Sequence, residues 1–365
     1  MSDASNTDHP RRMLCGRFPV HPIGIGCWAI GGPDHNLGMP TGWSTADDLA
    51  AREGLELAFH LGANLFDTAD IYGHGHSERL IGHLVRQVPR RDLVLSGKVG
   101  YFAGTAAHAY SPSHMRRQLE ATLENLCTDH LDLYAFHNEN FGTDDRFLEA
   151  AIEQMQAFRR EGLIKAIGMR GPHRFATERM TTAKGRRAEK RSRFLQLLTR
   201  IKPDYVALRF NAFTPVPRVA DTPLFAYLAE RGVDVLATKP LAQGLLTGKY
   251  RAQSPPRFAS GDHRLRKAWF TPQALERIDR GLEPLRDRFG RHPDQLARVA
   301  LRYCLQQGPN VVALVGFTRA EQVRENLGAV HLDLSAPEMA FIDSTVETIR
   351  RELDARSEFF VDELS

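Results

Sequence analysis

The sequence predicts a single-domain α/β protein in which eight parallel strands, each followed by a helix, close into a (β/α)8 TIM barrel. Short runs rich in Val, Ile and Leu alternate along the chain with longer stretches of helical spacing. This alternation is typical of a parallel sheet, and eight such runs occur in order, as a closed barrel requires. An open doubly wound sheet is the alternative, but the Gly24–Gly26 pair lacks the third glycine and immediate helix of a dinucleotide fingerprint.

The chain divides into a loose tail at 1–12, a barrel at 13–335 with long loops at its site-bearing face, and a C-terminal helix and tail at 336–365. A short hairpin or irregular lead-in is expected at 13–20. The predicted strands are 23–28, 64–67, 93–97, 131–137, 164–168, 205–210, 233–238 and 311–315. The predicted helices are 44–60 with Ser44 or Thr45 as cap, a helix capped by Ser77, 111–126 capped by Ser111, 144–160, 272–288, 293–307, 319–329 and 336–351.

Composition narrows the possible partners. The chain has 365 residues, 42% of them hydrophobic, and a formal net charge of +4, too small to indicate a nucleic-acid protein. Its four cysteines are scattered without metal-ligand spacing, so we expect reduced thiols, no bound metal and a cytoplasmic location. No apolar signal region begins the chain and no run is long enough to span a membrane. The oligomeric state cannot be predicted from the sequence.

Polar side chains of catalytic types end three consecutive predicted strands. Asp67 ends the second strand, Lys98 follows the third, and His137 ends the fourth. Tyr72 lies in a glycine-rich loop just after Asp67. Each residue alone is typical of a cap, a turn or packing. Because the carboxyl ends of barrel strands share one site-bearing face, we expect the four side chains to meet there.

These four groups suit carbonyl reduction, and none of them needs a metal. A tyrosine hydroxyl can donate the proton, but its unperturbed pKa of about 10 is high for work at neutral pH. A neighbouring ammonium lowers that pKa, and Lys98 can supply the charge. Asp67 can hold Lys98 charged and in place. His137 can donate a hydrogen bond to the substrate oxygen as charge develops there.

Two segments resemble signature blocks of the aldo-keto reductase superfamily: FDTADIYGHGHSE at 66–78 and LDLYAFH at 131–137. The resemblance covers about 14–334. It implies NADPH or NADP+ as cofactor and a small-molecule aldehyde or ketone as substrate. It also implies one acid with three supporting residues, namely Tyr72 with Asp67, Lys98 and His137.

Later stretches resemble the cofactor-binding blocks of this family. The stretch 240–249 resembles its pyrophosphate-clasping loop, and 316–326 resembles its adenosine-phosphate block. A helix start offers N–H groups to phosphate, and an arginine there can pair with an extra ribose phosphate. A capped helix with a solvated face is the alternative for 316–326. The cofactor-binding residues implied are Arg170, Asn211, Lys239, Pro240, Leu241, Gln243, Gly244, Gly316, Thr318, Arg319, Gln322, Glu325 and Asn326.

Three nicotinamide contacts differ from the usual pattern of the family. Arg170-Gly171 replaces Ser-Asn, Ala207 replaces Gln, and Thr238-Lys239 replaces an aromatic residue and Ser. If both cations lie near the nicotinamide, they repel its oxidised, positively charged form and favour net reduction. Otherwise they hold an acidic group of the substrate, point to solvent or pair with acids.

The sequence therefore predicts an NADPH-dependent reductase of aldehydes or ketones and leaves two rivals. One is a reductase-like barrel that binds the cofactor as a regulatory ligand for a partner. The strongly basic segment 184–193 and the altered nicotinamide contacts favour it, although this segment also suits a solvated helix or mobile loop. The other is a lyase or isomerase that uses Tyr72 and Lys98 for proton transfer without net redox.

Overall fold

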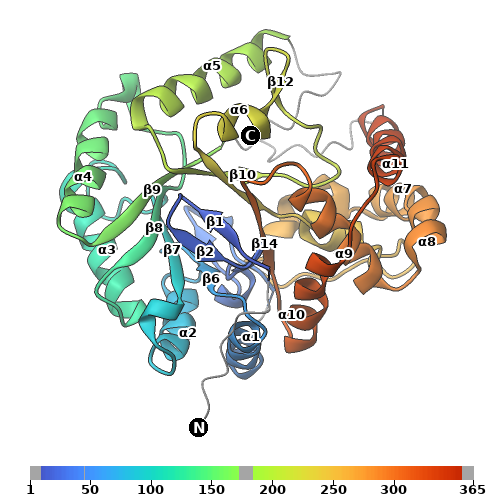
Figure 1. Ribbon diagram of the computed structural model, residues 1–365, viewed down its shortest axis with the longest axis horizontal. Coiled ribbons are helices and arrows are strands. Elements are labelled where there is room, and N and C mark those ends of the chain that lie inside the picture. Colours follow the sequence, from blue (N-terminus) through green and yellow to red (C-terminus); the bar gives the residue numbers. More distant parts are fainter. Residues whose placement is uncertain (1–9, 45, 172–183, 356–365) are drawn as a thin grey trace.

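The computed structural model describes residues 10–44, 46–171 and 184–355, and for 184–190 it describes the backbone alone. Eight parallel strands close into a barrel in the order β10–β13–β14–β3–β6–β7–β8–β9, with helices around the outside (Figure 1). This confirms the predicted (β/α)8 fold. The barrel strands are β3 (Ile23–Gly26), β6 (Leu65–Asp67), β7 (Val94–Val99), β8 (Leu131–Phe136), β9 (Ile164–Arg170), β10 (Tyr205–Arg209), β13 (Asp234–Thr238) and β14 (Val311–Gly316).

Most predicted helices are confirmed with shifted ends. The helices are α1 (Asp48–His60), α2 (His76–Val85), α3 (Pro112–Leu126), α4 (Leu148–Arg160), α5 (Lys184–Ile201), α6 (Leu224–Ala229), α7 (Pro272–Gly281), α8 (Glu283–Phe289), α9 (Pro293–Leu305), α10 (Ala320–Leu327) and α11 (Ala336–Asp354). Helix α6 was not predicted. The predicted helix 272–288 is two helices, because Pro284 has no N–H with which to continue the hydrogen-bond ladder.

Three predicted helix caps differ from the structure. Ser111 takes the N-cap position of α3, but its side chain makes no capping hydrogen bond. The side chain of Asp47, not Ser44 or Thr45, caps α1 by accepting from the N–H groups of Leu49 and Ala50. Ser44 instead donates a hydrogen bond to Asp262, and Thr45 lies outside the described residues.

Ser77 does not cap α2, because that helix follows Gly75, whose φ is 85°. The Ser77 hydroxyl donates to the Cys27 carbonyl at 2.8 Å and accepts from Thr68 at 3.0 Å. It therefore ties the loop of the predicted tyrosine to the first barrel strand.

A hairpin closes the amino end of the barrel, as expected for 13–20. It consists of β1 (Arg12–Leu14) and β2 (Phe18–Val20), which lie across the barrel opening in Figure 1. The Cys15 N–H donates to the carboxylate of Asp234 at the start of β13. Since this end is covered, the carboxyl ends of the strands form the open, site-bearing face.

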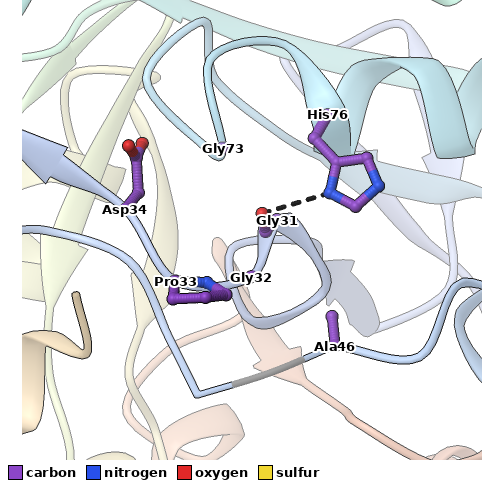
Figure 2. Close-up of a pocket in the computed structure, with 7 residues that line it drawn as sticks. All are labelled: Gly31, Gly32, Pro33, Asp34, Ala46, Gly73 and His76. Carbon is purple, nitrogen blue, oxygen red and sulfur yellow. Dashed lines mark hydrogen bonds between the residues drawn. The ribbon is translucent and has the colours of Figure 1, made fainter. Parts of the chain in front are cut away.

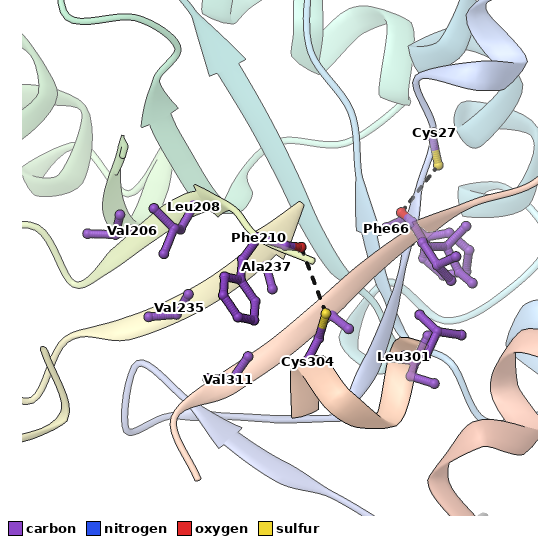
Figure 3. Close-up of a cluster of buried hydrophobic side chains, with 14 of the residues drawn as sticks. Cys27, Phe66, Val206, Leu208, Phe210, Val235, Ala237, Leu301, Cys304 and Val311 are labelled. Atoms are coloured by element: carbon purple, nitrogen blue, oxygen red, sulfur yellow. Dashed lines mark hydrogen bonds between the residues drawn. The ribbon is translucent and has the colours of Figure 1, made fainter. Parts of the chain in front are cut away.

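Strand side chains alternate between two apolar cores. One core lies inside the barrel and includes Leu65, Leu133 and Tyr205. The other lies between the strands and the helices, where Cys304 of α9 packs beside Phe210 (Figure 3). Because the period of a strand is two, each inward residue predicts the facing of the residue two positions later. This alternation decides which strand-end side chains enter the site.

Two further short hairpins lie within the loops. They are β4 (His35–Asn36) with β5 (Met39–Pro40), and β11 (Arg218–Val219) with β12 (Thr222–Pro223). The first of them belongs to the glycine-rich loop after β3, which pairs with a second long loop. The N–H of Gly42 donates to the carbonyl of Gly261 at 2.9 Å, and the N–H of His263 returns a bond to Gly42 at 3.0 Å.

Candidate active site

The barrel brings the four predicted catalytic side chains to one place. Asp67 ends β6, Lys98 is the fifth residue of β7, and His137 directly follows β8. All three share the inward phase of their strands, because Leu65, Val94 and Leu133 belong to the inner core. Tyr72 reaches the same point from the loop before α2, and its ring centre lies 5.9 Å from that of His137.

Lys98 and Asp67 form a buried ion pair. The Lys98 Nζ donates to Asp67 Oδ2 at 2.7 Å, and the two side chains are each 5% exposed. Ser96 donates to the other carboxylate oxygen at 2.8 Å. Burial by itself lowers the pKa of Lys98, but the charges and hydrogen bonds of Asp67 and Tyr72 outweigh it and raise that pKa. Lys98 is therefore an ammonium at neutral pH.

The ammonium of Lys98 also contacts Tyr72. Its Nζ lies 3.5 Å from the Tyr72 hydroxyl and 5.0 Å from the ring centre. Burial raises the pKa of Tyr72 above its ordinary value, whereas the charges of Lys98 and Arg170 act to lower it. The expected effect of the lysine is present, but burial dominates. The pKa of Tyr72 is therefore raised overall, and Tyr72 is a neutral phenol at neutral pH.

Arg170 points into the site from the end of β9. Its Nη1 donates to the hydroxyl of Tyr101 at 2.7 Å and to the His137 carbonyl at 3.2 Å. The Tyr101 ring centre lies 4.6 Å from that of His137. Tyr101 was not recognised in the sequence, because it sits in a loop with no strand-end pattern to mark it.

Trp28 forms a second wall of the site, just past β3. Its ring centre lies 6.2 Å from that of Tyr72, and the Lys239 Nζ lies 4.8 Å from the centre of the indole. The buried amide of Asn211 donates to the Lys239 carbonyl at 3.1 Å and accepts from Phe213 N–H at 3.1 Å. Asn211 thus holds the backbone beside the site.

The predicted pyrophosphate loop carries polar atoms without protein partners. Gln243 is 8% exposed, and both polar atoms of its amide are buried and make no hydrogen bond within 10–44, 46–171 or 184–355. Gln243 and Lys239 are in the left-handed region at φ 60° and 57°, an arrangement that side chains normally avoid. A buried unsatisfied amide is costly unless a ligand completes it, so this loop fits a polar cofactor.

Cations gather around the same loop. Burial, followed by the charges of Arg264 and Arg319, lowers the pKa of Lys249 to about 8. A side chain at Gly244 would meet Lys249 Cε at 2.8 Å, and φ there is 92°, so only glycine fits. We call Lys249, Arg264 and Arg319 the loop cluster. Pro240 is buried and Leu241 is half-buried in the same loop.

The predicted adenosine-phosphate block begins α10. Gly316, Thr318 and Arg319 are exposed, Asn326 is buried and Glu325 is half-buried. The Gln322 carboxamide accepts from the N–H groups of Thr318 and Arg319 at 2.8 and 3.3 Å. These two N–H groups are therefore capped, so a phosphate here would rely on the arginine charge or would displace Gln322.

Arg264 joins the two long loops over this region. It pairs with Asp262 at 2.6 Å, and its guanidinium lies 3.8 Å from the ring centre of Trp43. Trp43 in turn lies edge-on to Trp28, with ring centres 5.2 Å apart. Residues more than 200 positions apart in sequence meet here, which no local pattern could have indicated.

A pocket of about 330 Å³ lies beside the site. Figure 2 shows His76 of α2 turned towards the carbonyl of Gly31, with Asp34 on the opposite side. The full lining is Gly31, Gly32, Pro33, Asp34, Ala46, Gly73 and His76. None of the four catalytic candidates lines it, so it is a neighbour of the site and not its substrate pocket.

Two buried acids lie in the loop and helix that follow Asp67. The Glu78 carboxylate accepts from Thr122 and Asn125 at 2.8 Å each. Neither carboxylate oxygen of Asp70 accepts from a side chain among the described residues. Burial and then the charge of Glu78 raise the pKa of Asp70 well above its ordinary value, and the Ile71 N–H acts in the opposite direction.

The barrel and its lysine–aspartate–tyrosine grouping define a TIM-barrel enzyme of the oxidoreductase type. The sequence model of the Aldo/keto reductase family matches residues 22–347, and the chain therefore belongs to that family. As a member, it is an NADP(H)-dependent oxidoreductase.

Individual relatives share about a quarter of their residues with this chain. The NADH-specific methylglyoxal reductase of Escherichia coli is 26% identical, covering 90% of this chain and 95% of that protein. The aldo-keto reductase yakc of Schizosaccharomyces pombe, named for NADP+, is 24% identical, covering 94% and 92%. A glycerol dehydrogenase structure from Gluconobacter oxydans has a TM-score of 0.68 at 22% identity, covering 98% of each chain, and supports the fold.

Within the described ranges, no helix is both long and apolar enough to cross a membrane. No group of three or more His, Cys, Asp or Glu in this part of the chain could hold a metal ion.

Proposed function

We propose that this protein reduces an aldehyde or ketone to an alcohol with NADPH, and that Tyr72 donates the proton. The observation that carries this proposal is the position of the Lys98 ammonium, which contacts Asp67 at 2.7 Å and the Tyr72 hydroxyl at 3.5 Å. The substrate is a small molecule, because the reacting groups lie at the mouth of a filled barrel. We propose a cytoplasmic location, since all four cysteines are free thiols.

The residues divide the reaction between them. NADPH supplies a hydride to the carbonyl carbon. The Tyr72 hydroxyl gives its proton to the carbonyl oxygen, so that one C–H and one O–H bond form and a tyrosinate remains. Lys98 stabilises this tyrosinate by charge and hydrogen bonding, and Asp67 keeps Lys98 in place. His137 directs the carbonyl oxygen towards Tyr72.

The protonation state of Tyr72 suits the reduction step. Because burial keeps Tyr72 protonated at neutral pH, the proton donor is loaded before the substrate arrives. Alcohol oxidation would require the tyrosinate, and we expect its rate to rise with pH. The amide of Gln243, the ammonium of Lys249 and the guanidinium of Arg319 are the groups that we propose hold the cofactor phosphates.

Tyr72→Phe tests the mechanism. The variant keeps the ring and removes the acid, so we expect turnover to fall by at least about 10²-fold while NADPH affinity changes little. Turnover is followed as loss of reduced-nicotinamide absorbance with a panel of aldehydes and ketones. Tyr227→Phe on α6 is the matched control, because that ring lies on the outer helical layer.

The same assay separates the rival functions. NADPH binding without consumption by any carbonyl would favour the regulatory role. Conversion of a carbonyl compound without NADPH consumption would favour the lyase or isomerase. Near-normal turnover by Tyr72→Phe would remove this tyrosine from the mechanism.

A further inference from the structure

The Lys98 ammonium has three N–H donors and three acceptors among the described residues. Besides Asp67 Oδ2 at 2.7 Å and the Tyr72 hydroxyl at 3.5 Å, it donates to the backbone carbonyl of Thr68 at 2.5 Å. The two short bonds, to Asp67 and Thr68, fix the position of the nitrogen. The direction of the remaining N–H, towards Tyr72, therefore depends on where the Thr68 carbonyl lies.

The bond from Lys98 to Tyr72 is the most sensitive of the three to displacement. At 3.5 Å it is longer than the usual range of about 2.7–3.2 Å for N–H···O bonds. A small further separation would break this bond and leave the two shorter bonds in place. When Tyr72 gives up its proton, the bond becomes charge-assisted and shortens. This shortening requires that the two groups be held in line.

Thr68 is held by a chain of two buried hydroxyl groups. Its Oγ1 donates to the Ser77 hydroxyl at 3.0 Å, and that hydroxyl donates in turn to the Cys27 carbonyl at 2.8 Å. Thr68 is 1% exposed and Ser77 is 0% exposed, so neither hydroxyl is open to water. The Cys27 N–H donates to the backbone carbonyl of Asp67 at 2.8 Å. Because Asp67 precedes Thr68 in the chain, these bonds close a ring that joins β3 to the end of β6.

Ser77 also holds the backbone of the catalytic tyrosine. Its N–H lies in the first turn of α2, where N–H groups have no partner within the helix, and it donates to the Tyr72 carbonyl at 3.2 Å. One residue therefore contacts both parts of the reacting pair. Its N–H holds the Tyr72 backbone, and its hydroxyl holds the residue whose carbonyl orients Lys98.

We propose that Ser77 is a positioning residue of the reduction, because it holds the Thr68 carbonyl and the Tyr72 backbone at a fixed separation. The lysine ammonium then meets the tyrosine oxygen as the proton is transferred. This inference rests on the proposed reductase function. Ser77 acts through Thr68 and Tyr72 and needs no contact of its own with substrate or cofactor.

Ser77→Ala and Thr68→Val test the ring without changing any charge. Ser77→Ala removes both hydrogen bonds of the Ser77 hydroxyl, and Thr68→Val removes the bond between the two hydroxyls but keeps the Thr68 carbonyl and side-chain shape. In each variant we expect kcat for carbonyl reduction to fall about 10-fold and the KM for NADPH to stay within about threefold, as for one weakened hydrogen bond to a charged group. Thr68→Ser keeps the hydroxyl and should retain most of the activity.

The pH dependence of kcat distinguishes positioning from stability. Burial raises the pKa of Tyr72, and the charge and hydrogen bond of Lys98 oppose this effect. If the hydrogen bond is misaligned, the pKa of Tyr72 rises further. The basic limb of the profile should then move to higher pH by about 0.3–1 unit in Ser77→Ala and Thr68→Val, and it should stay in place in Thr68→Ser.

Thr345→Val is the matched control. The Thr345 hydroxyl is also buried and donates to a backbone carbonyl, that of Phe341 at 2.8 Å, but it lies on the outer helix α11. This variant should melt at a lower temperature than the wild type, as Thr68→Val should, because each loses a buried hydrogen bond. Its kcat and pH profile should not change. If Ser77→Ala does not fold, the comparison of Thr68→Val with Thr68→Ser decides.

The outcomes are distinct from those of the reductase test. Reduction by the wild type, with kcat and the pH profile unchanged in Ser77→Ala and Thr68→Val, would overturn this inference and leave the reductase function intact. Lower melting temperatures alone would give Ser77 a structural role only. Equal losses of kcat in Thr68→Ser and Thr68→Val would also overturn the inference, because the hydroxyl would then have no part in the effect.

If the wild type reduces no carbonyl, the reductase function fails and NMR tests the positioning directly. Tyrosine labelled with a carbon isotope at Cζ reports the ionisation of Tyr72, whose resonance is identified by its absence from Tyr72→Phe. A higher apparent pKa of Tyr72 in Thr68→Val than in Thr68→Ser would support the inference. Equal values in the two variants would reject it.

Discussion

Replacing Lys98 with methionine tests whether the buried ion pair serves catalysis as well as stability. Lys98 and Asp67 are each 5% exposed and lie 2.7 Å apart. Lys98→Met keeps most of the side-chain volume but leaves the Asp67 carboxylate buried, with Ser96 as its remaining side-chain donor among the described residues. Removing one partner of a buried pair costs about 3–5 kcal/mol of unfolding free energy, and we expect a loss in this range.

Loss of Lys98 should also change the pH dependence of catalysis. Both the charge of Lys98 and its hydrogen bond act to lower the pKa of Tyr72 against the effect of burial. Without them the pKa of Tyr72 rises further, so the basic limb of the pH–rate profile should move to higher pH. We expect kcat to fall about 10²- to 10⁴-fold, because the developing tyrosinate loses its counter-charge.

A double variant separates the two roles. Asp67→Asn with Lys98→Met removes both charges, so it should be more stable than Lys98→Met alone while turnover stays low. Lys165→Met is the control, since Lys165 contacts the buried Asp132 at 2.9 Å on the outer face of the barrel. The assays are urea unfolding and the pH dependence of kcat. An unchanged pH profile in Lys98→Met, or activity restored in the double variant, would refute the assigned role.

Three further predictions follow from charges in and around the site. Arg319→Ala should weaken the binding of NADPH about 10- to 100-fold and that of NADH much less, as measured by calorimetry. Equal weakening of both would exclude Arg319 as the residue that recognises the 2′-phosphate. Arg170→Ser with Lys239→Ser should shift the difference between the binding free energies of NADPH and NADP+ by about 1–3 kcal/mol in favour of NADP+. An unchanged difference would reject the redox bias. Asp70→Asn should stabilise the protein by about 1–3 kcal/mol more at pH 8 than at pH 4. The pKa of Asp70 is raised in the folded state, so its contribution to stability is full below the unfolded pKa and declines as pH rises towards the folded pKa. A pH-independent difference in urea unfolding would contradict this.

The sequence alone was sufficient for the barrel and for the positions of Asp67, Lys98 and His137. Strand periodicity and parallel connections are local or nearly local properties, and in a parallel barrel they place every strand end on one face.

Tertiary structure decided the remaining features of the site. The contacts of Tyr101 with Arg170, of Arg209 with Trp269 and of Gly42 with Gly261 join segments that are far apart in sequence. No periodicity reports such contacts, because each loop adopts its conformation against the others. The protonation state of Tyr72 was likewise decided by the tertiary structure. The sequence identified a cation that lowers the pKa, but the opposing cost of desolvation depends on how completely the folded chain removes water from the hydroxyl.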